Sequence, residues 1–156
     1  MAEMEKSIDV EAPLHETYRQ WTQFEEFPHF MEGVLEVRQL DDKHLYWRAK
    51  VGGVEREWHA EIVDQVPDER IAWRGLTGVA PRGAVLFRPM PDGHTEITLR
   101  MQYEPEGVTE NVGDALGFLS RRVQGDLERF KDFIEDRGRA SGGWRGEIHG
   151  DDVERR

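Results

Sequence analysis

The chain has 156 residues, of which 37% are hydrophobic and 34% are charged, as is typical of one globular domain that buries its own core. Its 32 acidic residues outnumber the 21 lysines and arginines. The resulting formal net charge of −11 repels nucleic-acid phosphates and anionic lipid surfaces. The absence of cysteine excludes disulfides, thiolate catalysis and cysteine-ligated zinc. Because the negative charge repels phosphates, we expect no nucleic-acid partner.

The sequence also lacks signals for export or membrane insertion. No stretch approaches the roughly eighteen consecutive apolar residues of a membrane-spanning helix. The N-terminal residues MAEMEKSIDV contain no apolar signal region. Together with the absence of cysteine, this predicts a cytoplasmic protein without an integral membrane segment.

The first predicted elements are a strand and two short helices. In residues 5–12 (EKSIDVEA) apolar and polar residues alternate as in a strand, which Pro13 ends. Pro13 suits the first turn of a helix, because the N–H that it lacks is not needed there. Pro28 interrupts the following segment and predicts a second short helix. The first helix carries an apolar stripe of Leu14, Tyr18 and Trp21.

Between residues 33 and 104 the pattern changes to strands separated by turns. The dipeptides Gly52-Gly53 and Asp92-Gly93 are typical links of tight hairpins. Parallel pairing needs long crossovers, which this region lacks, so its six strands predict an antiparallel meander. The predicted strands are VLEVRQL, HLYWRAKV, VEREWHAEIVDQV, RIAWRGL, GAVLFRPM and TEITLRMQY.

Residues 110–137 have the period of an amphipathic helix. Thr109 is suited to cap its N-terminus, and Gly138 is a natural stop. Residues 138–156 show no periodicity and predict a disordered tail. The apolar stripe of the helix consists of Val112, Leu116, Leu119, Val123, Leu127, Phe130 and Ile134.

This order of elements predicts an α+β helix-grip fold for residues 1–137. It consists of a seven-stranded curved antiparallel sheet, two short helices after the first strand and a long C-terminal amphipathic helix. The long helix must bury its stripe, and the concave face of the sheet is the large surface that can receive it. Such an arrangement typically leaves a cavity between the sheet and the helix.

Three segments resemble one protein superfamily. They are WTQFEEFPHFMEGV, HLYWRAKVGGVEREWHAEI and YEPEGVTENVGDALGFLSRRVQGDLERFKDFIE. In their order, residues 4–137 resemble the SRPBCC (START-like, birch-pollen-allergen-like) superfamily. The closer resemblance is to its actinobacterial-type polyketide cyclase/dehydrase or coenzyme Q-binding proteins. The resemblance implies the fold, but members range from cyclases through lipid and quinone carriers to proteins with no known ligand.

The sequence lacks the common motifs of serine hydrolases, histidine metal sites and nucleotide-binding loops. The three serines form no G-x-S-x-G elbow, and the six histidines form neither H-E-x-x-H nor an H-x-H pair. The Gly-Gly pair in VGGVE lies between strands and does not open a helix, which argues against a nucleotide site. We therefore expect neither a metal site nor a cofactor.

Arg56 is the weak catalytic candidate in VEREWHAEIV. Strand alternation places it on one face with four apolar residues, so we expect that face to point into the cavity. The resemblance implies that such an arginine orients a polyketide and stabilises enolate charge. Arg56 could instead pair with a buried carboxylate, or reach the edge of the sheet and pair with a surface acid. The companions of Arg56 on this face are Val54, Trp58, Ala60 and Ile62.

The same alternation predicts an aromatic, methionine-containing inner surface that suits a flat apolar ligand. Tyr103 is a second weak catalytic candidate, because its hydroxyl could donate a proton or a hydrogen bond. Alternatively, these side chains fill the space themselves. The predicted ligand-binding residues on the strands are Trp47, Arg56, Trp58, Trp73, Phe87, Leu99, Met101 and Tyr103.

The aromatic stretch QWTQFEEFPHFMEG (residues 20–33) has two interpretations. Its large side chains can pack the two short helices onto the sheet and the long helix. Alternatively, Phe27, Phe30 or Met31 also lines the cavity mouth, and we include Phe30 and Met31 among the candidate ligand-binding residues on this ground.

Three functions agree with these observations. The first is the binding or carriage of a small hydrophobic molecule, such as an aromatic, quinone, polyketide or lipid-like compound, in an internal cavity. The second is an aromatic polyketide cyclase/dehydratase that uses Arg56 and Tyr103. The third is an interaction or chaperone-like module whose cavity is filled and whose acidic surface binds a partner.

Overall fold

The computed structural model describes residues 2–51, 53–76, 82–103, 112–137, 144, 146–150 and 152–154, with residues 2, 51, 103 and 112–120 described by their backbone alone. Thr109 and Gly138, the predicted ends of the long helix, lie outside these residues. So do the side chains of Tyr103 and of the first half of the predicted helix stripe.

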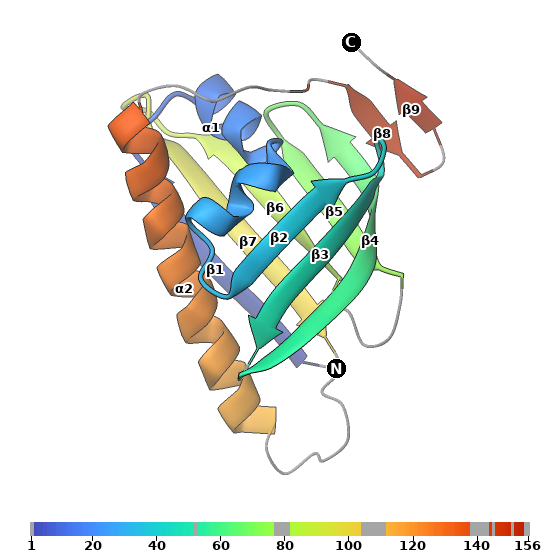
Figure 1. The fold of residues 1–156 in the computed structure, drawn as a ribbon. Helices are drawn as coiled ribbons and strands as arrows, with labels where there is room; N and C mark the ends of the chain where they lie inside the picture. The colour runs from blue at the N-terminus through green and yellow to red at the C-terminus, as the bar shows by residue number, and fades with distance from the viewer. Residues whose placement is uncertain are drawn as a thin grey trace.

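A curved antiparallel sheet grips a long helix, α2, and two short helices close one end (Figure 1). The strand order is β1-β7-β6-β5-β4-β3-β2, which confirms the predicted meander. The elements are β1 (Ala2–Val10), α1 (Leu14–Trp21), the 3-10 helix η1 (Phe24–His29), β2 (Val34–Gln39), β3 (His44–Val51), β4 (Val54–Val66), β5 (Arg70–Gly75), β6 (Arg82–Pro89), β7 (Thr95–Tyr103), α2 (Val112–Arg137), β8 (Glu147–His149) and β9 (Asp152–Glu154).

The helix-grip prediction is therefore confirmed, with a sheet of nine strands in place of seven. Two hairpin turns depend on glycine: Gly53 has a φ of 83° and Gly93 a φ of 82°, in the left-handed region that other residues rarely adopt. The sequence dipeptides thus mark the β3–β4 and β6–β7 turns correctly. Within the described residues, no helix is both long and apolar enough to cross a membrane.

Helix α2 is held on both of its sides by side chains that bind backbone carbonyls. Arg129 Nε donates to the carbonyl of Phe30 at 2.9 Å, just before β2. Lys131 Nζ donates to the carbonyl of Asp9 at 3.1 Å, at the end of β1. The helix therefore spans the opening between the two edge strands of the curved sheet. Its described stripe residues, Val123, Leu127, Phe130 and Ile134, are all buried as predicted.

The aromatic side chains of residues 20–33 mainly pack α1 and η1 onto the core. Phe30 is 2% exposed, and its ring lies 5.1 Å from that of Phe130 in an edge-to-face contact. Met31 is partly buried against the same cluster. The packing interpretation is confirmed for the four rings, since Trp21, Phe24, Phe27 and Phe30 are all buried.

A β-bulge at Val63 changes which side chains of β4 face inward. The pairing with β5 shifts between Ile62 and Asp64, so that Gln65 rather than Asp64 enters the core. Gln65 is 1% exposed, and its Nε2 donates to the hydroxyl of Tyr18 at 3.0 Å. The bulge thus joins the end of β4 to α1 through a buried polar contact.

The prediction of a disordered tail is wrong for the described residues 146–150 and 152–154. Strand β8 pairs with β4, where Ile148 lies opposite Gln65, and β9 pairs with β8. Along β4, the pairing with β3 extends from Val54 to Glu61. The edge of β4 after Glu61 is therefore left open by β3, and β8 pairs with it at Asp64 and Gln65. Ile148 is fully buried there, and one apolar side chain without periodicity is too weak a signal to predict this strand.

His149 on β8 lies between two acidic side chains, Glu147 of its own strand and Asp64 of β4. Its Nε2 lies 3.0 Å from Glu147 and its Nδ1 lies 3.5 Å from Asp64. The hydrogen bond with Glu147, together with the nearby charge of Asp64, raises the pKa of His149 above 6.5.

Because this pKa is raised in the folded state, protonated His149 stabilises the folded protein. This contribution to the free energy of unfolding is complete below pH 6.5 and is lost as the pH rises through the higher pKa of the folded state. We expect His149→Gln to lower the melting temperature more at pH 5.5 than at pH 8.5. Thermal unfolding of both proteins at each pH measures this. A difference between the proteins that does not change with pH would contradict the prediction.

Candidate ligand-binding site

The inner face of the sheet is packed at one end and carries partly exposed aromatic side chains at the other. Near α1 and η1, side chains such as Ile71 and Ile97 are fully buried. Farther along the strands, Trp47, Trp73 and Met101 are only partly buried against the core. Trp58 lies opposite Trp47 and is also partly buried. We call Trp47, Trp58 and Trp73 the inner tryptophans.

Two of the inner tryptophans form a flat stack. Trp47 and Trp58 are cross-strand partners on β3 and β4. Their ring centroids lie 5.9 Å apart, and their planes differ by only 4°. Phe27 contacts Trp47 with ring centroids 5.6 Å apart, so η1 supports the stack from the packed end. Such a stack offers a rigid apolar surface to a flat ligand.

Trp73 lies directly against the backbone of β6 because its cross-strand partner is Gly83. A Cβ atom added to Gly83 would be 2.8 Å from Cζ2 of Trp73 and 2.7 Å from the carbonyl oxygen of Arg100. No side chain fits at position 83 unless both the indole and the backbone of Arg100 move. The glycine therefore sets the position of the third inner tryptophan.

The other predicted ligand-binding residues lie at different depths. Phe87 and Leu99 are on the inner face as predicted but are 6% and 7% exposed, so they form part of the packed core, as Phe30 does. Met31 lies at the edge of that core. The side chain of Tyr103 lies outside the described residues.

Arg56 is on the inner face but is exposed. It pairs with the buried Ala49, which places both side chains on the same side of the sheet, near the β3–β4 turn. Val54, two residues before it, is 54% exposed. The alternation alone would suggest that buried apolar side chains surround Arg56. The structure instead places Arg56 at the exposed edge of the candidate site.

Lys6 is a residue of this face that the sequence analysis missed. It lies opposite Leu99 on β1, between the inward-facing Met4 and Ile8, and is partly buried. The alternation that identified Ile8 and Val10 extends to Lys6 and would have found it.

The inner face is cationic although the chain is acidic. Among the described residues of β1–β7, the sheet register places Lys6 and Arg56 on this face and places no Asp, Glu or His there. The acids of these strands lie on the outer face, where Glu61, for example, binds Arg74 at 2.8 Å. Burial of Glu61 opposes its ionisation, but Arg74, Lys43 and His44 outweigh this and lower its pKa.

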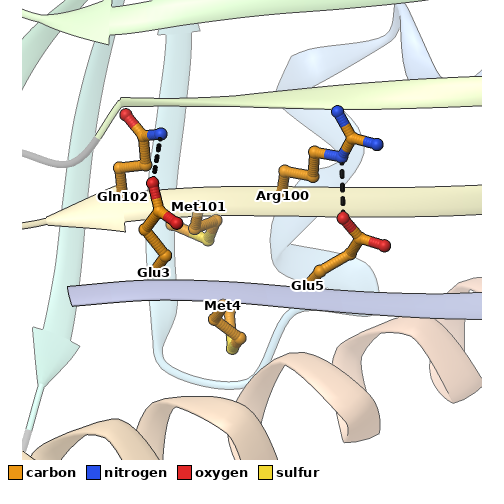
Figure 2. A pocket seen from close by; sticks show the side chains of 6 residues that line it. All are labelled: Glu3, Met4, Glu5, Arg100, Met101 and Gln102. Carbon is orange, nitrogen blue, oxygen red and sulfur yellow. Dashed lines mark hydrogen bonds and ion pairs between the residues drawn. The ribbon is translucent and has the colours of Figure 1, made fainter.

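A shallow depression of about 380 Å³ lies across the β1–β7 pair (Figure 2). Its polar side chains pair with one another across the strands: Gln102 Nε2 donates to Glu3 Oε1 at 2.9 Å, and Arg100 Nε donates to Glu5 Oε2 at 2.8 Å. Figure 2 shows Met4 on the side of β1 nearer α2, away from the two glutamates. These paired polar groups form ordinary cross-strand contacts of the outer face.

Comparisons with known proteins agree with this architecture. The family described as polyketide cyclase / dehydrase and lipid transport matches residues 10–132. An uncharacterized 17.2 kDa protein in the melC2-rnhH intergenic region of Streptomyces lincolnensis is 50% identical over 149 residues, which cover 95% of this chain and 99% of that protein.

Solved structures share the fold. A Deinococcus radiodurans protein is 28% identical with a TM-score of 0.68, over 88% of this chain and 99% of the other. The ZhuI aromatase/cyclase from Streptomyces sp. R1128 is 17% identical with a TM-score of 0.74, over 91% and 98%. A START superfamily protein of Mycobacterium smegmatis is 12% identical with a TM-score of 0.72, over 85% and 98%. At identities this low, the last two show the fold alone.

Proposed function

Because the chain belongs to the polyketide cyclase/dehydrase and lipid transport family, we propose that it binds a small hydrophobic molecule on the inner face of its sheet. The family supports ligand binding or polyketide cyclisation in general, and the inner tryptophans support binding in particular. They are large apolar side chains that remain partly exposed on a face whose other end is packed. An aromatic, quinone, polyketide or lipid-like molecule would cover them.

The chemistry of the inner face favours binding over catalysis. General acid–base catalysis needs a group that titrates near neutral pH and reaches the substrate. In the strand segments that the structure describes, the inner face carries no carboxylate and no imidazole. Binding requires only the apolar surface that the inner tryptophans provide.

One observation favours the cyclase as a second candidate. Arg56 lies on the inner face at the edge of the site, where it could contact an enolate oxygen of a polyketide that extends outward. Expression of the protein in a cell that makes the polyketide, followed by product analysis, tests this. An unchanged product profile with Arg56→Ala would remove the main support for the cyclase.

Titration with a neutral fluorescent probe, N-phenylnaphthylamine, tests the binding proposal. We expect saturable binding with energy transfer from tryptophan, and a loss of affinity of about tenfold in Trp58→Ala, because a large aromatic contact is removed. Trp58→Phe should lose less, since it keeps an aromatic ring. Trp144→Phe is the control, because Trp144 lies at the opposite end, where its backbone N–H binds Thr22.

Native mass spectrometry of the protein from its own cells provides a second test. We expect a bound hydrophobic molecule that organic solvent releases. A clean apo mass, together with no probe binding and no thermal shift across a quinone and lipid panel, would overturn the proposal. That result would instead favour an interaction module with a filled cavity.

A further inference from the structure

We infer that the ligand is a hydrophobic anion and that Lys6 binds its charged oxygen. This inference rests on the proposed function and specifies the chemical class of the ligand. Lys6 lies on β1, and its cross-strand partner Leu99 is 7% exposed. On its own strand, Met4 is 8% exposed and Ile8 packs against the core. The side chain of Lys6 therefore lies on an apolar part of the inner face.

The ammonium of Lys6 has no counter-charge among the residues that the structure describes. No hydrogen bond or ion pair joins it to another residue in the part of the chain that the structure describes. Other partly buried lysines do have such partners: Lys43 lies 3.5 Å from Glu61, and Lys131 binds Glu135. Removing a charge from water is costly unless a counter-charge replaces the water. An anionic ligand would supply the counter-charge that the described strands do not place on the inner face.

The separation of charge between the two faces also favours an anion. The chain has an excess of 11 negative charges, yet its described strands keep every carboxylate on the outer face. Pairs such as Arg88 with Glu96, at 3.0 Å, neutralise part of that charge outside. Inside, a ligand meets Lys6 and, at the edge, the exposed Arg56. A carboxylate or an enolate is thus stabilised within the site and repelled elsewhere on the surface.

The proposed complex has two contacts. The apolar part of the ligand lies against the inner tryptophans, and one of its anionic oxygens accepts a hydrogen bond from Lys6 Nζ. A charge-assisted bond of this kind is stronger than a bond between neutral groups, particularly where water is excluded. It would fix the orientation of an otherwise symmetrical apolar ligand.

Two related probes separate the charge from the apolar contact. Anilinonaphthalene sulfonate and N-phenylnaphthylamine share their aromatic rings, and only the first carries a sulfonate. Both are titrated into the wild-type protein and into Lys6→Met, Lys6→Arg and Lys50→Met. Lys50 lies on the outer face of β3 and is exposed, so Lys50→Met makes the same change in net charge without changing the inner face.

We expect Lys6→Met to weaken sulfonate binding about tenfold, and the binding of the neutral probe less than about twofold. Lys6→Arg should retain sulfonate binding, and Lys50→Met should leave both affinities unchanged. Circular dichroism and the melting temperature of each variant establish that the probe reports on a native fold.

The outcomes distinguish this inference from the proposed function. If the neutral probe binds but Lys6→Met leaves sulfonate affinity unchanged, the role of Lys6 is overturned and the hydrophobic site stands. If Lys6→Met and Lys50→Met lose equal sulfonate affinity, the loss comes from the change in net charge and not from a contact with Lys6. This result would also overturn the role of Lys6. If neither probe binds the wild-type protein, the proposed function fails as well.

Discussion

Replacing Phe130 with alanine is expected to lower the free energy of unfolding by about 3–5 kcal/mol, the usual cost of removing a buried ring from a packed core. Phe130 is fully buried on α2. Its ring makes edge-to-face contacts with Trp21 at 4.8 Å and with Phe30 at 5.1 Å between centroids. One side chain thus connects α2 with α1 and with the segment before β2, and its removal leaves a cavity where three elements meet.

Phe133→Ala is the matched control for Phe130→Ala. Phe133 is on the same helix but is only partly buried, with Phe30 at 5.3 Å and Arg137 over its ring. We expect this variant to lose about 1–2 kcal/mol, because less apolar area leaves water on folding. Urea unfolding of the three proteins measures both values. Equal losses in the two variants would contradict the position assigned to Phe130.

Replacing Gly83 with alanine is expected to cost about 1–3 kcal/mol of stability, as overpacking of a close contact does. It should also weaken the binding of N-phenylnaphthylamine. The added methyl group would stand 2.8 Å from Trp73 and 2.7 Å from the carbonyl oxygen of Arg100, so the indole must move away from β6. A displaced Trp73 would enter the space that we assign to the ligand.

A double-mutant cycle with Trp73→Ala separates the two contacts of the added methyl group. Without the indole, Gly83→Ala should cost less than it does in the wild-type protein. The remaining cost comes from the carbonyl oxygen of Arg100, which the backbone holds in place. Urea unfolding and probe titration of all four proteins complete the cycle. An identical cost of Gly83→Ala in both backgrounds would mean that Trp73 does not lie against position 83.

Most of the fold could be predicted because its elements bury one face each. The alternation in residues 95–103 predicted Ile97 and Leu99 on the inner face, and both are buried. The spacing of Leu127, Phe130 and Ile134 predicted the buried stripe of α2. Such periodic patterns report burial directly, since successive side chains alternate in a strand and recur every third or fourth residue in a helix.

The site could be predicted only in part. Alternation identified the correct face for Trp47, Trp58 and Trp73 but could not separate them from Phe87, which the core buries. Depth along a strand depends on which other elements cover that face, and here α1 and η1 cover one end (Figure 1). The close contact of Trp73 with Gly83 joins residues of different strands and requires the register.

The sequence by itself determined the family, the order of the strands and helices and the side of the sheet on which each alternating residue lies. These properties follow from local periodicity and from turn residues such as Gly93, which act over a few positions. Tertiary structure alone decided that β8 would occupy the open edge of β4, that the bulge at Val63 would turn Gln65 inward, and that Arg56 would be exposed while Lys6 stands among apolar side chains. Each of these depends on a neighbour distant in sequence, because pairing and burial join residues that no local pattern connects.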